Sequence, residues 1–181
     1  MKNTISLSQT ALRFLCGAIV AFTAQSAFAT DAAVNSTDKS FLQNAYEDGL
    51  AEVKMGELGQ SKSANADIKA FAKMMVKDHT ATMKAMGPLV QAAGKAPADK
   101  LDDRRQGFID HLNKASDADF DKVYVDQQVA AHKEAEDLMT GYAKDGSDAG
   151  LKDGAAKTAP KVQMHLDKIS GIQTALAAAK K

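Results

Sequence analysis

A long amphipathic repeat near the C-terminus constrains the fold of this chain most. Apolar or small residues recur every three or four positions there: Leu151, Ala155, Thr158, Val162, His165, Ile169, Ile172 and Leu176. That spacing places them on one face of an α-helix, and such a face is normally buried against other helices. The repeat predicts a helix over residues 148–178, with a kink at Pro160 one turn before His165.

Similar repeats predict three more long helices, over residues 38–61, 65–93 and 116–144. A composition rich in Ala, Lys, Asp and Met, without tryptophan, favours helix throughout. Thr37 or Asp38 is expected to cap the first helix and Asn65 the second. Pro88 should bend or shorten the second helix. The first helix carries Gly49, Gly56 and Gly59 on its inner face, where the lack of side chains lets a neighbouring helix approach closely.

A shorter amphipathic segment connects the second and third long helices. It covers residues 99–114 and has Leu101, Arg105, Phe108 and Leu112 on one side. At about 1.5 Å per residue it is long enough to cross much of a bundle, as the long connection of ferritin-like folds does. The fold class predicted is therefore all-α. A ferritin-like four-helix bundle with an additional short connecting helix should form a single domain over residues 38–181.

The N-terminus has the pattern of a secretory signal peptide. Lys2 and Arg13 precede the apolar run 14–24, and Ala27-Phe28-Ala29 is typical of a cleavage site. The run is shorter than the roughly 20 residues that span a bilayer. We expect residues 1–29 to be removed, residues 30–37 to form a flexible leader, and the protein to be periplasmic or associated with the outer membrane. Cys16 lies too close to Arg13 to favour a lipoprotein.

Charge and cysteine content exclude several function classes. Without Lys2 and Arg13, 21 of the 23 basic residues remain against 23 acidic ones, which leaves a net charge of −2. This does not favour nucleic acid as a partner, since nucleic-acid binding needs a clustered positive surface. The expected mature chain has no cysteine for disulfides or thiolate chemistry, and no further stretch is apolar enough to span a membrane.

Three histidines and a glutamate lie at matching heights in the four long helices. Glu52, His79, His132 and His165 are each about 14 to 17 residues from the start of their helix, near its midpoint. Midpoints coincide whichever way a helix runs, and each histidine lies on an apolar stripe. Because imidazole binds zinc, copper, iron and nickel, and bundles build metal sites from facing helices, the pattern predicts one transition-metal ion there.

The alternative is that these histidines are core residues satisfied by neighbouring carboxylates. The candidate partners are Glu136, one turn after His132, and Asp126. If a metal is bound, these carboxylates would support the ligating histidines without binding the ion themselves. Asp78 is expected to point away from the core and is the weaker candidate. His111 lies on the connecting segment, away from this level, and is interpreted as a surface residue. The methionines of the second helix are interpreted as core filling.

The order and spacing of these residues resemble a known family. The matching segments are Phe41-x3-Ala45 with Gly49-Leu50-Ala51-Glu52-Val53, Val76-Lys77-Asp78-His79, Tyr124-x7-His132 and Pro160-x4-His165-Leu166. Together they are similar to the bacterial exported family called domain of unknown function 4142, whose members are labelled periplasmic or outer-membrane proteins. The resemblance spans residues 40–172. It implies a ferritin-like bundle and no settled activity.

One departure from the ferritin-like pattern bears on the metal. Di-iron bundles carry Glu-x-x-His on two helices, but here Val76, Val129 and Val162 precede the histidines by three positions. A di-iron centre is therefore not expected, whereas a mononuclear zinc, copper or iron site is. A haem would have to be bound without covalent attachment, because no C-x-x-C-H motif is present.

Two functions remain open at this point. The first is an exported bundle that binds a metal ion or small ligand through Glu52, His79, His132 and His165. The second is a non-enzymatic cell-envelope protein, acting through contacts with proteins or surfaces, with Phe108 and Leu112 as an exposed apolar patch. Enzymatic activity is not favoured, because no nucleophile elbow, phosphate loop or reactive cysteine is present. Glu136 is the only candidate base for metal-assisted hydrolysis.

Overall fold

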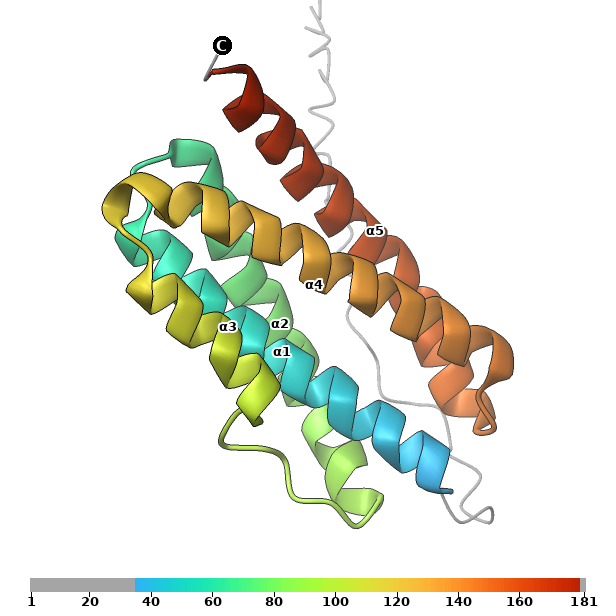
Figure 1. The fold of residues 1–181 in the computed structure, drawn as a ribbon. Helices are drawn as coiled ribbons and strands as arrows, with labels where there is room; N and C mark the ends of the chain where they lie inside the picture. Colours follow the sequence, from blue (N-terminus) through green and yellow to red (C-terminus); the bar gives the residue numbers. More distant parts are fainter. Residues whose placement is uncertain (1–34, 180–181) are drawn as a thin grey trace, which may run out of the picture.

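The computed structural model describes residues 35–179, and within them the chain is helical (Figure 1). The expected signal peptide, the expected cleavage site and residues 30–34 of the expected leader lie outside the described residues. The helices are α1 (Ser36–Lys62), α2 (Ala66–Ala92), α3 (Asp103–Lys114), α4 (Asp117–Asp145) and α5 (Ala149–Ala178). No helix of the described part is long and apolar enough to cross a membrane.

The four long helices form two tight hairpins, with α1 against α2 and α4 against α5. The connections within each hairpin are short, whereas residues 93–102 and α3 carry the chain back along the bundle before α4 begins. As a result, α2 and α4 run in the same direction, which is the topology of a bundle with one long crossover. The predicted ferritin-like bundle with a short connecting helix is confirmed.

Helix ends follow the sequence signals with one exception. Asn65, Ser116 and Asp148 cap α2, α4 and α5 through their side chains. The prediction that Thr37 or Asp38 caps α1 was wrong, because Asn35 accepts the Asp38 N–H and the helix begins at Ser36. The last residues of the expected leader therefore belong to α1.

Asp38 is buried instead, and it ties the start of α1 to the loop after α4. Its carboxylate accepts hydrogen bonds from the Tyr142 hydroxyl and, at 2.8 Å, from the Ser147 hydroxyl. Burial acts to raise the pKa of Asp38, but these hydrogen bonds outweigh it and the pKa is lowered. The Tyr142 ring stacks on Phe41 at a centroid distance of 3.7 Å. This contact holds the two hairpins together at one end of the bundle.

The α1–α2 hairpin depends on glycine at its contact face. A Cβ on Gly56 would lie 2.9 Å from the backbone carbonyl oxygen of Ala72, and one on Gly59 would lie 2.8 Å from the Tyr124 ring. Both distances are shorter than real Cβ contacts, so the helices could not pack this closely around alanine. The predicted close approach of a neighbouring helix is confirmed at these two residues.

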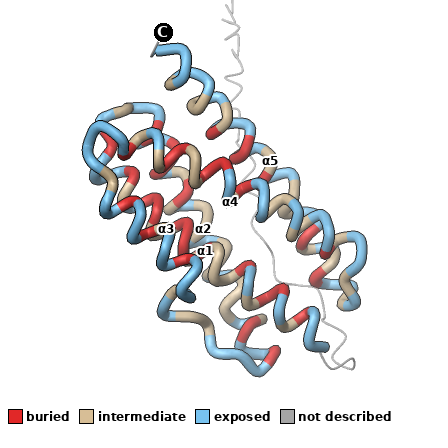
Figure 2. Tube along the Cα trace, in the orientation of Figure 1, coloured by how far each residue is buried: buried red, intermediate tan, exposed pale blue. Residues whose placement is uncertain are grey.

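The buried residues lie where the helices face one another (Figure 2). Their apolar side chains form two clusters. The larger is built around Met55, Ile68, Phe71, Leu112, Phe120, Tyr124, Val125 and Ile169. The smaller one contains Phe41, Leu42, Val90, Ala93, Tyr142, Leu151 and Ala155. Along every long helix, the polar layer of histidines lies between the stretches that enter these two clusters.

The short helix α3 does not present the apolar patch that the sequence suggested. Leu112 is completely buried in the larger cluster, and Phe108 is half-buried against it. Arg105 is also buried and forms ion pairs with Glu47, Asp48 and Asp102. The proposed exposed patch at Phe108 and Leu112 was therefore wrong, since α3 turns this side inward onto α1 and α4.

Candidate metal centre

Three histidines from three helices meet between the two apolar clusters. One ring nitrogen each of His79, His132 and His165 lies within 4.8 Å of the others. The ring centroids are 6.3 Å apart for His79 and His132, 5.9 Å for His79 and His165, and 5.6 Å for His132 and His165. The prediction that these histidines converge is confirmed, and α2, α4 and α5 supply one each.

Hydrogen bonds fix the tautomers of two of the rings. Nδ1 of His132 is 2.9 Å from the backbone oxygen of Gln128, and Nε2 of His165 is 3.1 Å from Oδ2 of Asp78. Both partners can only accept, so these ring nitrogens carry the protons. The lone pairs then lie on Nε2 of His132 and on Nδ1 of His165.

Two buried nitrogens of the cluster have no hydrogen-bond partner among the described residues. They are Nε2 of His79 and Nε2 of His132. A buried polar atom without a partner costs roughly 1–3 kcal/mol, so native proteins rarely keep one without a reason. A bound metal ion would accept both lone pairs, and this chemistry makes the residues fit a metal.

Burial keeps two of the three rings, those of His79 and His165, neutral at neutral pH. Burial, reinforced by the neighbouring imidazoles, lowers the pKa of His79 to about 3. Burial also lowers the pKa of His165 to about 4, although the hydrogen bond to Asp78 opposes the change. Because a metal binds neutral imidazole, His79 and His165 need no deprotonation at neutral pH to act as ligands.

Glu52 lies beside the cluster but not within it. Its buried carboxylate accepts a 2.8 Å hydrogen bond from Nε2 of Gln128 and lies 3.9 Å from Nδ1 of His132, on the side of the ring that carries the proton. Burial raises the pKa of Glu52, opposed by His132 and Gln128. The group of candidate ligands in the described part contains the three histidines without Glu52.

The carboxylates around the site differ from those expected. Asp78 faces the cluster, where it contacts both His165 and Lys161, so the expectation that it points away was wrong. Its pKa is lowered, because the hydrogen bonds from those two residues outweigh the effect of burial. Nδ1 of His132 uses the Gln128 carbonyl rather than Glu136, which is half-buried one turn further along α4.

The remaining residues considered in the sequence lie away from the cluster. Asp126 contacts Lys122 on its own helix and accepts a 2.9 Å hydrogen bond from Gln173 of α5. His111 is exposed on α3, 3.1 Å from Gln127. Sequence reasoning missed Gln128, although its position one turn before His132 places it on the same face of α4.

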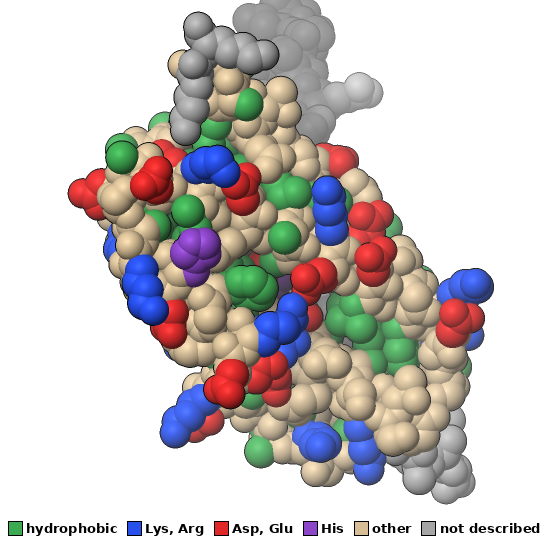
Figure 3. Space-filling model, viewed as in Figure 1, with side chains coloured by type: hydrophobic (Ala, Val, Ile, Leu, Met, Phe, Trp, Pro, Cys, Tyr) green, Lys and Arg blue, Asp and Glu red, His purple; other side chains and the backbone are tan. Residues whose placement is uncertain are grey.

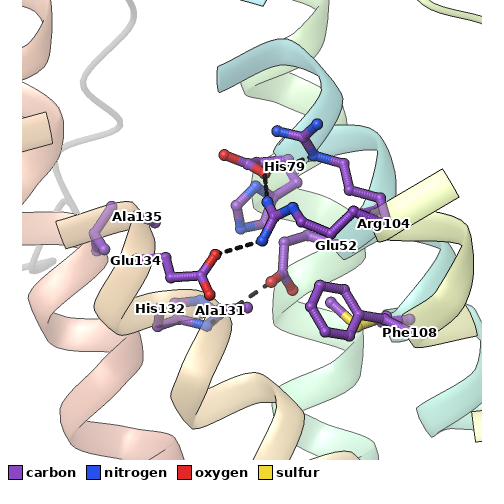
Figure 4. A pocket seen from close by; sticks show the side chains of 13 residues that line it. Glu52, His79, Arg104, Phe108, Ala131, His132, Glu134 and Ala135 are labelled. Carbon is purple, nitrogen blue, oxygen red and sulfur yellow. Dashed lines mark hydrogen bonds and ion pairs between the residues drawn. The ribbon is translucent and has the colours of Figure 1, made fainter. Parts of the chain in front are cut away.

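A small cavity of about 40 Å³ leads to the histidines (Figure 4). Glu52, His79 and His132 line it on the inside, and Arg104 and Glu134 line it toward solvent. Its volume is enough for a water molecule or an ion. On the molecular surface, this face is hollowed near its centre beside acidic and basic side chains (Figure 3).

Solved structures with this fold include copper-bound forms of another protein. The chain is similar to CopM in the Cu(I)-bound form, with a TM-score of 0.65 and 17% identity over 78% of this chain and 99% of that one. CopM in the Cu(II)-bound form gives a TM-score of 0.61 and 15% identity, covering 77% and 97%. At these identities the likeness shows the fold alone.

Sequence comparison identifies the family. No curated protein sequence matches the chain. The family described as "Domain of unknown function (DUF4142)" matches residues 23–172, which includes all four residues of the histidine layer and most of α5. The chain therefore belongs to the DUF4142 family, as its motifs suggested.

Proposed function

We propose that this protein is an exported helical bundle that binds one transition-metal ion, copper in the first place, through His79, His132 and His165. The observation that carries the proposal is the convergence of three buried ring nitrogens within 4.8 Å. Three such ligands leave a position open for water or a further ligand, supplied through the cavity.

The surroundings support ligation by these histidines. Metal-bound histidines usually donate their other N–H to a carboxylate or a backbone carbonyl, which orients the ring and raises its basicity. The acceptor for His165 is the Asp78 carboxylate, and the acceptor for His132 is the backbone carbonyl of Gln128. We assign Glu52 to the same supporting role, as a carboxyl group 3.9 Å from Nδ1 of His132, in place of direct ligation.

The ligand set favours copper over hard cations. Imidazole suits copper, zinc, iron and nickel, whereas magnesium and calcium prefer oxygen ligands. The copper-bound forms of CopM, which shares the fold, support copper as the first choice. Val76, Val129 and Val162 occupy the positions where di-iron bundles carry glutamate, so we do not propose a di-iron centre.

The proposal includes export to the periplasm through cleavage of the N-terminal 29 residues. The basic start, the short apolar run and the Ala-Phe-Ala site support it. Contacts with envelope proteins or with the outer membrane remain part of the proposal, but the apolar side of α3 is not available for them.

Elemental analysis tests the site. The protein is produced from the full chain without a histidine tag, purified without chelators, and compared with a His79→Ala/His132→Ala variant and a His111→Ala control. We expect about one copper ion per chain in the wild type and in the control, because three imidazoles at one point define one site. The double variant should hold none while keeping its helical circular dichroism. Absence of bound metal in the wild type after incubation with Cu(II), or its retention by the double variant, would overturn the proposal.

A further inference from the structure

The cavity beside the histidines connects them to solvent between α1, α3 and α4. Its inner wall includes Glu52 and His132, which are 5% and 2% exposed. Its outer wall includes Arg104 and Glu134, whose side chains are 50% and 58% exposed. Because the cavity is lined by buried residues at one end and exposed residues at the other, it leads from the surface to the candidate ligands.

The Arg104 side chain lies across the outer end of this route. Its guanidinium donates to Oε2 of Glu134 on α4 at 2.7 Å and lies 3.7 Å from Oδ1 of Asp48 on α1. It also lies over the Phe108 ring, 5.7 Å from its centroid. Arg104 thus joins three helices at the mouth of the cavity, and it neutralises the Glu134 carboxylate, which would otherwise face an incoming cation (Figure 4).

The neighbouring Arg105 behaves differently and holds α3 in place. It is 4% exposed and forms ion pairs with Glu47 at 2.9 Å and with Asp48 at 2.8 Å. Its guanidinium also donates to the backbone oxygen of Asn44. Because Arg105 anchors α3 against α1, the mouth can open by movement of the Arg104 side chain alone.

The Arg104 contacts are weak enough to break often. Exposed ion pairs contribute little to stability, and exposed side chains change rotamer in picoseconds to nanoseconds. We propose that Arg104 is a gate for the metal: its departure opens the cavity and frees the Glu134 carboxylate, which attracts a cation, while Asp48 stays paired with Arg105. This inference rests on the proposed function of the histidine cluster and concerns how the ion enters and leaves.

A gate changes rates and leaves affinity nearly unchanged. Arg104 faces the same mouth whether the ion is entering or leaving, and it is not one of the candidate ligands. In Arg104→Ala, association and dissociation should both be faster by roughly two- to sixfold, because weak exposed ion pairs hold the gate closed for only part of the time. The dissociation constant should then change by less than about threefold, as the two rates rise together.

The experiment is stopped-flow mixing of the metal-free protein with Cu(II), followed by tyrosine fluorescence, since the chain has three tyrosines and no tryptophan. Dissociation is measured by adding excess EDTA to the loaded protein. Lys133→Ala is the matched control, because it removes one exposed positive charge beside Glu134 without lining the cavity. Glu134→Gln is the second variant, which weakens the same bridge from α4 and should also speed dissociation.

The outcomes separate the gate from the site. Faster binding and release in Arg104→Ala, with rates like the wild type in Lys133→Ala, would support the gate. Rates in Arg104→Ala equal to those of the wild type, or matched by Lys133→Ala, would overturn the gate and leave the site intact. Failure of the wild type to bind Cu(II) would overturn the proposed function, and the gate with it. Thermal unfolding confirms that each variant is folded. If Arg104→Ala does not fold, the dissociation rate of Glu134→Gln tests the gate in its place.

Discussion

At the scale of single residues, the histidine layer is built from rings that are only partly satisfied. His132 donates one N–H to the Gln128 carbonyl on its own helix, and His165 donates one to Asp78 on α2. Nε2 of His79 and of His132 have no partner in the described structure. A core designed only for stability would not retain such atoms. These two nitrogens are the atoms that the proposed metal ion would bind.

Asp78 should strengthen metal binding although it is not one of the candidate ligands. Its hydrogen bond to His165 orients the ring, and loss of such a partner typically lowers metal affinity by about 10- to 100-fold. We expect Asp78→Asn to weaken Cu(II) binding by this factor in competition titrations with a chelator. Asp153→Asn, on an exposed part of the same bundle, should leave the affinity unchanged. Equal affinities for Asp78→Asn and the wild type would show that this hydrogen bond does not support the site.

The lowered pKa of His79 predicts a dependence of stability on pH. Below about pH 6.5 the unfolded chain binds a proton at this residue, but the folded protein does not until about pH 3. Because the unfolded state then binds more protons, stability falls as the pH falls through this window. The slope contributed by one such group approaches about 1.4 kcal/mol per pH unit.

We therefore expect His79→Gln to flatten the curve of unfolding free energy between pH 6.5 and 5 in the metal-free protein. Urea unfolding monitored by circular dichroism measures it, with His111→Gln as the control because that ring is exposed on α3. Parallel curves for the wild type and His79→Gln would contradict the lowered pKa.

At the scale of the helices, sequence signals located the elements well. The cap Asn65, the start of the last helix at Asp148 and the repeat in α5 were identified from local patterns alone. The start of α1 was not, since Asn35 and Thr37 are both suitable caps. Asp38 cannot serve as the cap, because its side chain accepts hydrogen bonds from Tyr142 and Ser147, more than a hundred positions away. Asn35 caps the helix instead.

The close approach of α1 and α2 gives a prediction about Gly56. In Gly56→Ala the new methyl group would lie 2.9 Å from the Ala72 carbonyl oxygen and 2.7 Å from Cγ2 of Val76. We expect a loss of about 1–3 kcal/mol in the free energy of unfolding, because overpacking outweighs the higher helix propensity of alanine.

Gly171→Ala provides the matched control for this substitution. Gly171 also lies inside a helix, but no heavy atom comes within 4 Å of an added Cβ. Here only the propensity changes, and the protein should gain roughly 0.5–1 kcal/mol. Denaturant unfolding of both variants measures the difference, and a stabilised Gly56→Ala protein would show that the helices can separate at little cost.

At the scale of the whole molecule, a polar layer divides the apolar interior into two clusters. This division should reduce the stability of the metal-free protein. In His79→Leu/His132→Leu, the two unpartnered nitrogens are replaced by apolar groups, and we expect the metal-free variant to be about 1–3 kcal/mol more stable than the wild type.

Copper should reverse this order. An ion at 1,000 times its dissociation constant stabilises the folded state by about 4.1 kcal/mol, and only the wild type can bind it. Thermal unfolding with and without Cu(II) provides the measurement. A leucine variant that is less stable than the metal-free wild type would indicate that the histidines contribute to packing rather than to a site.

The sequence alone determined the helices, their inward faces and the shared height of Glu52, His79, His132 and His165. These follow from the period of 3.6 residues per turn and from chain length, which are local properties. Only the tertiary structure decided which helix flanks each face. It placed Asp78 of α2 against His165 of α5, Arg104 across the cavity mouth, and Glu52 behind His132. Those contacts depend on how the two hairpins and α3 pack around one another, and the periodicity within a single helix does not specify that arrangement.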